Sequence, residues 1–451
     1  MPSSAQAYNR LMSDNYQCFK ARRERLLAIM AAAGGGVAVI PNAQEKLRNR
    51  DSHFPFRADS YFHYLSGFPE PEAVLLLIAG DTKNESLLFC RDKDPEKEVW
   101  DGFRYGPAAA PGHFGVDAAH SVKELDEKLV ELLAAHPSLW YSLGHDAEFD
   151  ARISRSLNAL RAQARSGRRA PTTVHDVHAA LDAMRQIKGI EEIALMRRAA
   201  EISAAAHRRA MRASAPGKFE YQIEAELLCE FRASGSQAPA YNSIVAGGAN
   251  ACVLHYVGNS QPLKDGELLL IDAACELDGY AADITRTFPI NGRFSGPQAD
   301  VYDLVLDAQA AAIAAIRPGA EFNDGHDAAL AVIVRGLIDL KLLAGSVDGI
   351  IESEAYKRFY MHRTSHWLGL DVHDAGEVKR GERWKTLEAG MVLTVEPGCY
   401  IRAADDIPAA FHNIGVRIED DALVTSDGCD LLTDAAPKTI ADIEALMRDG
   451  R

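Results

Sequence analysis

Two aspartates at the ends of predicted strands have the spacing of metal ligands. Asp272 ends an apolar strand pattern, and Asp283 follows an Asp-Gly pair at 278–279, the preferred centre of a two-residue hairpin turn. That turn places Asp272 opposite Thr285 and puts Asp283 on the same face, as diagonal neighbours about 7–8 Å apart at the backbone. Side chains at this spacing can hold two metal ions about 3.5–4 Å apart. Taken alone, the pair fits structural acids equally well.

Two glutamates repeat this pattern further along the chain. Glu396 ends the apolar run 391–396, and Glu419 ends the strand pattern 414–419, where Arg417 lies on the same face. A structural salt bridge between Arg417 and Glu419 is the alternative for that pair. If the four carboxylates share one pocket, their combined charge of about −4 is not tolerated unpaired in a low-dielectric site, whereas two divalent cations neutralise it.

Histidines cluster in the segment 361–374, which holds His362, His366 and His373. His255 stands on a further predicted strand. No His-Glu-x-x-His zinc motif is present. One imidazole would complete an oxygen-rich shell, which suits Mn²⁺, with Co²⁺, Fe²⁺ or Zn²⁺ as alternatives. The remaining histidines are then free to bind substrate or transfer protons.

These residues must be positioned by two domains, predicted as 1–175 and 176–451. The first third alternates helix and strand, which is typical of an α/β domain, and the polar segment 162–173 reads as a linker or exposed loop. The second domain is predicted to be α+β, with strands dominating from Tyr241. The predicted helices are 17–33, 122–135, 174–212 with a break near 188–189, 297–316, 323–340 and 440–448, and the predicted early strands are 37–40, 73–79 and 86–90.

Composition excludes several classes of protein. The 451 residues carry 49 Lys and Arg against 64 Asp and Glu, a formal charge of −15, which disfavours nucleic-acid binding. No apolar run reaches the roughly 18 residues of a membrane span, and residues 1–25 have the character of neither a signal peptide nor an anchor. Seven cysteines without a Cys-x-x-Cys pair fit reduced thiols in the cytoplasm.

Taken together, these segments resemble the aminopeptidase P family of pita-bread metallopeptidases. Five ordered motifs of the second domain carry the resemblance, and three segments extend it into the first domain. The segments are 253–256, 270–289, 365–374, 392–398 and 415–421, and then 54–57, 64–71 and 98–100. The resemblance implies a creatinase-like α/β first domain, a pita-bread α+β catalytic domain and assembly into a homo-oligomer, either a dimer or a tetramer.

The resemblance also implies roles for individual residues. Five side chains are implied to bind two metal ions, most often Mn²⁺: Asp272, Asp283, His366, Glu396 and Glu419. Asp283 and Glu419 would bridge the two ions, and Arg417 would support the shell around Glu419. The implied substrate contacts are His255, His362, His373, Trp100 and, in a lengthened loop, Arg383. The chain departs from the family at Arg363, where many relatives carry glycine.

The expected reaction is hydrolysis of the bond between an N-terminal residue and a following proline. A hydroxide bridging the two metals would attack the carbonyl, Glu396 would shuttle its proton, and His255 or His373 would stabilise the oxyanion. Prolidase, which cleaves Xaa-Pro dipeptides with the same ligand pattern, is the nearest alternative. Methionine aminopeptidases generally lack such a first domain, and creatinase lacks the five ligands. A pita-bread module that binds protein or nucleic acid without catalysis is the remote alternative.

Overall fold

The computed structural model describes residues 16–80 and 83–449. The chain divides into two compact units, Met1–Met184 and Arg185–Arg451, and the division falls within helix α8 (Val177–Gln186). Residues 1–15 lie outside the described part of the chain, and most of the prediction for residues 1–25 falls on them. The units are described separately below.

The first unit is built on a mixed six-stranded sheet with the strand order β6-β5-β4-β1-β7-β8. Strand β1 runs antiparallel to β4 and parallel to β7. The strands are β1 (Gly36–Pro41), β4 (Val74–Ala79), β5 (Asn84–Cys90), β6 (Ala118–Ser121), β7 (Ser138–Trp140) and β8 (Thr173–His175), with a separate hairpin of β2 (Leu47–Asn49) and β3 (Ser52–His53). The predicted strands 37–40, 73–79 and 86–90 are thus confirmed, as part of an α/β unit.

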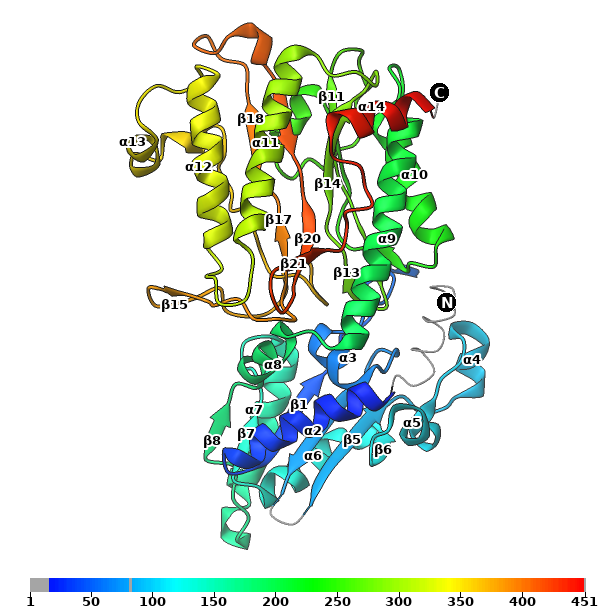
Figure 1. Ribbon diagram of the computed structural model, residues 1–451. Helices are drawn as coiled ribbons and strands as arrows, with labels where there is room; N and C mark the ends of the chain where they lie inside the picture. The colour runs from blue at the N-terminus through cyan, green and yellow to red at the C-terminus, as the bar shows by residue number, and fades with distance from the viewer. Residues whose placement is uncertain (1–15, 81–82, 450–451) are drawn as a thin grey trace. The chain divides into compact units, whose positions relative to one another are not determined.

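Helices cover this sheet because apolar side chains project from both of its faces. Val37 and Val39 of β1 pack in one core with Leu129 of α6 and Ile153 of α7, and α2 contacts β4 (Figure 1). The helices are α2 (Tyr16–Ala32), α3 (Ser60–Ser66), α4 (Pro95–Asp101), α5 (Gly106–Phe114), α6 (Leu125–Ala135) and α7 (Ala147–Ala162). The predicted linker from 162 therefore begins at the last residue of α7.

In the second unit, helices flank a group of short sheets. Figure 1 shows α11 and α12 to one side of the strands and α9 and α10 to the other, and each pair is in contact along its length. The helices are α9 (Ile190–Ala213), α10 (Glu220–Ala233), α11 (Gly296–Ala315), α12 (Asp324–Asp339), α13 (Val347–Glu352) and α14 (Ile440–Asp449). The predicted break near 188–189 is confirmed, since α8 ends before it and α9 begins after it.

The strands of the second unit form sheets of two or three strands. Their orders are β10-β11-β14, β13-β12-β9, β17-β20-β21, β18-β19 and β15-β16. The strands are β9 (Ala238–Pro239), β10 (Ile244–Gly247), β11 (Leu268–Asp272), β12 (Cys275–Leu277), β13 (Tyr280–Ala281), β14 (Thr285–Pro289), β15 (Lys379–Arg380), β16 (Arg383–Trp384), β17 (Val392–Val395), β18 (Gly398–Ile401), β19 (Ile414–Arg417), β20 (Asp420–Val424) and β21 (Cys429–Leu431). This mixture of helices and mainly antiparallel strands confirms the predicted α+β class.

The hairpin that carries the two aspartates has the predicted register. Asp278 and Gly279 form the turn with φ of 48° and 86°, as a type I′ turn requires. Asp272 pairs with Thr285, and Leu277 pairs with Tyr280. The turn chemistry therefore sets which side chains of both strands share a face.

Two global expectations can be compared with the described residues. None of the helices in these ranges is both long enough and apolar enough to cross a membrane. All seven cysteines are free thiols, so no disulfide links the parts of the chain that the structure describes.

Candidate metal centre

A cavity of about 730 Å³ opens in the second unit and brings most of the predicted site residues together. It contains all five predicted metal ligands, three of the predicted substrate contacts and Arg417. They are Asp272, Asp283, His366, Glu396 and Glu419, then His255, His362 and His373. Strands or strand ends supply the carboxylates, whereas the histidines at 362, 366 and 373 come from an irregular segment before β15.

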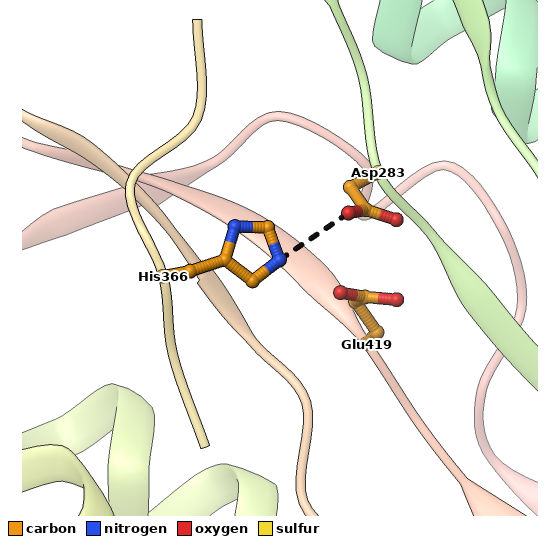
Figure 2. Close-up of side chains that lie close together, drawn as sticks. All are labelled: Asp283, His366 and Glu419. Carbon is orange, nitrogen blue, oxygen red and sulfur yellow. Dashed lines mark ion pairs between the residues drawn. The ribbon is translucent and has the colours of Figure 1, made fainter. Parts of the chain in front are cut away.

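Three of these side chains form the tightest cluster. One donor atom from each of Asp283, His366 and Glu419 lies within 4.8 Å of the other two, and the three side chains point toward one another in Figure 2. Asp283 and Glu419 are 5% and 2% exposed. Two buried carboxylates and one imidazole that converge on one point are a donor set for a divalent cation.

The ring of His366 is oriented as a metal ligand. Its Nδ1 lies 3.0 Å from the carbonyl oxygen of Trp367, so Nδ1–H donates there, and in the neutral, metal-binding form of the ring the lone pair is on Nε2. Nε2 lies 3.4 Å from Asp283 and 3.5 Å from Glu396. The ring of His373 stacks on that of His366, with ring centroids 3.9 Å apart.

Asp272 is held by two hydrogen bonds. Its Oδ1 accepts from the Tyr241 hydroxyl at 2.6 Å, and its Oδ2 accepts from Arg417 Nη2 at 2.6 Å. The predicted alternative for Arg417 was a salt bridge with Glu419, but in the described residues its ion pair is with Asp272. That interpretation was wrong because neighbouring side chains on one strand face point outward in parallel, whereas Asp272 comes from a strand that packs against β19.

Glu419 is fixed through a hydroxyl group. Arg417 Nε lies 3.1 Å from Thr285 Oγ1, and Thr285 Oγ1 lies 2.7 Å from Glu419 Oε2. A guanidinium only donates, so the Thr285 hydroxyl accepts from Arg417 and donates to Glu419. Arg417 thus orients two of the predicted ligands, one directly and one through Thr285.

The raised pKa values of two buried glutamates indicate that the site favours bound cations. Burial, reinforced by neighbouring carboxylates, raises the pKa of Glu396 to about 7 and that of Glu419 well above its ordinary value. Burial lowers the pKa of His366, but its interactions with Asp283 and Glu396 outweigh this and raise it to about 9. Without cations these acids hold protons, and divalent ions would displace them.

Comparisons with known proteins agree with this geometry. Residues 194–426 match the model of metallopeptidase family M24, and residues 19–140 match the N-terminal domain of aminopeptidase P. The chain belongs to metallopeptidase family M24. Over 429 residues it is 44% identical to a Haemophilus influenzae Xaa-Pro aminopeptidase, covering 95% of this chain and 96% of the relative.

Solved structures extend the similarity to the whole fold. Aminopeptidase PepP of Pseudomonas aeruginosa superposes with a TM-score of 0.94 at 49% identity, covering 96% of this chain and 98% of its own. A zinc-substituted Escherichia coli aminopeptidase P in complex with product matches with a TM-score of 0.94 at 43% identity, covering 97% of this chain and 99% of its own. The predicted two-domain architecture, a creatinase-like α/β domain and a pita-bread domain, is confirmed.

The donor set fits the metal that an M24 metallopeptidase requires. The clustered carboxylates and the free Nε2 of His366 supply hard oxygen donors and one imidazole. Asp272 keeps one unused lone pair on each oxygen beside its hydrogen bonds to Tyr241 and Arg417.

The other three histidines line the same cavity in different states. His362 Nε2 accepts from the Tyr400 hydroxyl at 2.8 Å, because that hydroxyl already accepts from Arg417 Nη1 at 3.0 Å. Burial, then Arg417, lowers the pKa of His362 to about 4, so its ring is neutral at physiological pH. Burial and His366 also lower the pKa of His373. His255 is exposed and has a face open to the cavity.

Two predicted substrate contacts lie outside the cavity lining. Arg383 is on β16 and borders a separate depression with Lys379 and Trp384. Trp100 is on α4 of the first unit, where 88% of its side chain is exposed. Arg383 is not part of the cavity lining, Trp100 belongs to the first unit, and the roles of both residues as substrate contacts stay predictions.

Four residues that support the site were not found from the sequence. Tyr241, Thr285 and Tyr400 contact Asp272, Glu419 and His362 respectively, and both carboxylate oxygens of Asp421 lie 3.2–3.3 Å from the backbone nitrogen of Asp283. A single polar side chain in a strand gives no local signal of a distant partner. For Thr285, the hairpin register gave a usable clue, since it stands opposite Asp272.

Proposed function

We propose that this protein is an Xaa-Pro aminopeptidase, which hydrolyses the bond between the N-terminal residue of a peptide and a following proline. The observation that carries the proposal is the buried cluster of carboxylates with His366, in a chain 44% identical to Xaa-Pro aminopeptidases along nearly its whole length. Prolidase activity is not favoured, since these full-length relatives are named as aminopeptidases.

Five residues are proposed to hold two divalent ions, Mn²⁺ by preference. The residues that would hold them are Asp272, Asp283, His366, Glu396 and Glu419, which all line the same cavity. When bound, the ions supply a water activated near neutral pH and polarise the scissile carbonyl. The relative with zinc in its site shows that a related chain accepts another metal, so the choice of Mn²⁺ is to be tested.

The chain's own residues are proposed to handle protons and substrate. Glu396, whose carboxylate lines the cavity beside the other proposed ligands, is suited to take a proton from the attacking water and pass it to the leaving proline nitrogen. That nitrogen has no hydrogen in the peptide, so it needs a proton to leave as an amine. His373 and His255 would hydrogen-bond the developing oxyanion, and Arg417 keeps Asp272 and Glu419 in place.

Selection of proline is proposed to depend on the apolar part of the cavity. Ile244, Leu254, Val257 and Val372 line it beside the charged cluster. A pyrrolidine ring fills such a surface without leaving a backbone N–H unpaired, because proline has none.

Turnover of defined peptides tests this function directly. The Mn²⁺-loaded protein is expected to release alanine from Ala-Pro-Ala and to act more slowly on the dipeptide Ala-Pro. Chelation should abolish turnover, and Mn²⁺ should restore it. The variant E396Q keeps the side chain's shape and removes its basic oxygen, so kcat should fall by about 10²–10⁴-fold. Activity that survives complete metal removal, or a preference for Ala-Pro, would contradict the proposal.

Assembly and location complete the proposal. We propose a homo-oligomer, a dimer or tetramer, because Val99, Trp100 and Phe103 are exposed by 80%, 88% and 66% around α4, and exposed apolar patches commonly mark interfaces. Light scattering of W100A against the unaltered protein measures this, with a shift toward monomer expected. The free cysteines support a cytoplasmic location, and no nucleic-acid or membrane partner is proposed.

A further inference from the structure

Arg363 is a cation that lines the cavity and is not used by the metal cluster. It follows His362 directly, its side chain is exposed, and it borders the same space as Glu396 and Glu419. The other arginine of this lining, Arg417, is buried and committed to Asp272, Thr285 and Tyr400.

The guanidinium of Arg363 lies over an aromatic ring, but among the described residues it has no acidic partner. Its Cζ lies 4.9 Å from the centroid of the Trp384 ring, a distance typical of a cation–π contact. Within residues 16–80 and 83–449, no ion pair or side-chain hydrogen bond involves Arg363. Its donors are therefore available to an anion that enters the cavity.

The cavity lining thus combines buried carboxylates with one exposed guanidinium. Asp283 and Glu419 are buried, whereas Arg363 is exposed to solvent. Lys379 lies over the same Trp384 ring, with its Nζ 4.9 Å from the centroid, but it does not line the cavity. A short peptide has matching ends, an α-amine and an α-carboxylate, and a tripeptide spans at most about 11 Å.

We propose that Arg363 binds a carboxylate of the substrate beyond the proline, and that in short peptides this is the C-terminal carboxylate. The inference rests on the proposed function, because it assumes that the α-amine of the peptide lies at the cluster of buried carboxylates. Arg363 would then make the enzyme selective for tripeptides and for other peptides that place a carboxylate one residue after proline.

Three substrates separate the possible sources of the carboxylate: Ala-Pro-Ala, its C-terminal amide, and Ala-Pro-Glu-amide. The unaltered protein is expected to favour Ala-Pro-Ala over the amide by about tenfold in kcat/KM, mainly through KM, as for one exposed charged hydrogen bond. In R363A, kcat/KM for Ala-Pro-Ala should fall to the value for its amide. R363K should keep part of the preference for Ala-Pro-Ala. A gain for Ala-Pro-Glu-amide that R363A removes would assign the contact to a side-chain carboxylate as well.

K379A is the matched control, because Lys379 contacts the same tryptophan but does not line the cavity. It should keep the preference for the acid. The inference is wrong if the unaltered protein treats acid and amide alike, or if R363A lowers kcat/KM for both by the same factor.

A binding experiment keeps this inference separate from the proposed function. Calorimetry with the Mn²⁺-loaded protein compares Pro-Ala with Pro-Ala-amide, which mimic the product and need no turnover. R363A should weaken the binding of Pro-Ala by about tenfold, so that its affinity equals that of Pro-Ala-amide. Loss of this difference in R363A supports the role of Arg363 even if no peptide is hydrolysed, and an unchanged difference overturns it.

Discussion

Nη2 of Arg417 lies 2.6 Å from Oδ2 of Asp272, although the two residues are 145 positions apart in the chain. The pair is almost buried, with side chains 4% and 13% exposed. Burial raises the pKa of Asp272, and the charge of Arg417 is the largest effect that opposes this rise. Arg417 therefore helps Asp272 to stay ionised, which is the form that binds a metal.

Replacement of Arg417 should weaken metal binding before it affects the fold. In R417M, Asp272 and the Thr285 hydroxyl lose a donor, and residues that orient metal ligands typically contribute about 10–100-fold to affinity. Titration of the stripped protein with Mn²⁺ by calorimetry measures the effect. R380A removes an exposed arginine paired with Glu377 and should change nothing. Equal Mn²⁺ affinities for R417M and R380A would contradict the role.

Metal loading should release protons near neutral pH. In the absence of cations, Glu396 has a pKa of about 7 and His366 one of about 9, so at pH 7 one is about half protonated and the other almost fully protonated. Both must lose their protons to bind metal. Calorimetry in buffers of different ionisation enthalpy should count more than one proton released at pH 7, falling toward none as the pH rises above 9. E396Q should release fewer protons, and an unchanged count would contradict the assignment.

How much of the site could be predicted from the sequence depended on whether its geometry is local. The placement of Asp272 opposite Thr285 followed from the Asp-Gly turn, since a two-residue loop fixes the register of both strands. The clustering of Glu396 and Glu419 with these aspartates rested on charge neutrality and on the family resemblance. Both arguments lead to the cavity that the structure shows.

Contacts between distant segments could not be predicted in this way. Nothing in the strand 414–417 shows that Arg417 pairs with Asp272 and not with its own neighbour Glu419, because the choice depends on how β19 packs against β11. The helix α10 (Glu220–Ala233) was missed, although its buried Ile223, Leu227 and Phe231 have helical spacing. Its polar residues between these positions left no continuous apolar run.

A fully buried histidine with a lowered pKa should make the fold sensitive to acid. Burial lowers the pKa of His207, on α9, to about 4, and its Nε2 donates to the carbonyl oxygen of Ala273 at 2.9 Å. Between pH 6.5 and 4, His207 is protonated in the unfolded chain but stays neutral in the folded chain. The free energy of unfolding therefore decreases as the pH falls, by up to about 3 kcal/mol. H207Q keeps a donor and does not titrate. Its free energy of unfolding, measured with urea, should fall less steeply over this range, and parallel curves would contradict the assignment.

A costly ion-pair change outside the metal cluster should be at Asp374. This carboxylate, 1% exposed, lies 2.5 Å from Arg185 Nη2 and 2.9 Å from Lys188 Nζ, whose side chains are equally buried. D374N removes the negative charge that faces both cations, although Arg185 keeps its pair with Asp371, and removal of one member of a buried ion pair typically costs about 3–5 kcal/mol. Asp406 offers a matched control, because it pairs with Arg358 at 2.5 Å on the surface, where D406N should cost far less stability than D374N.

Urea denaturation followed by tryptophan fluorescence compares the two variants, since Trp367 lies in the same unit and its carbonyl oxygen accepts from the Asp374 backbone N–H at 2.9 Å. D374N should also lower kcat, because Asp374 directly follows His373 and anchors the segment that carries it. If D374N lost no more stability than D406N, the ion pairs of Asp374 with Arg185 and Lys188 would not stabilise the segment that carries His373. A large loss of stability with unchanged kcat would separate the anchoring of the fold from the positioning of His373.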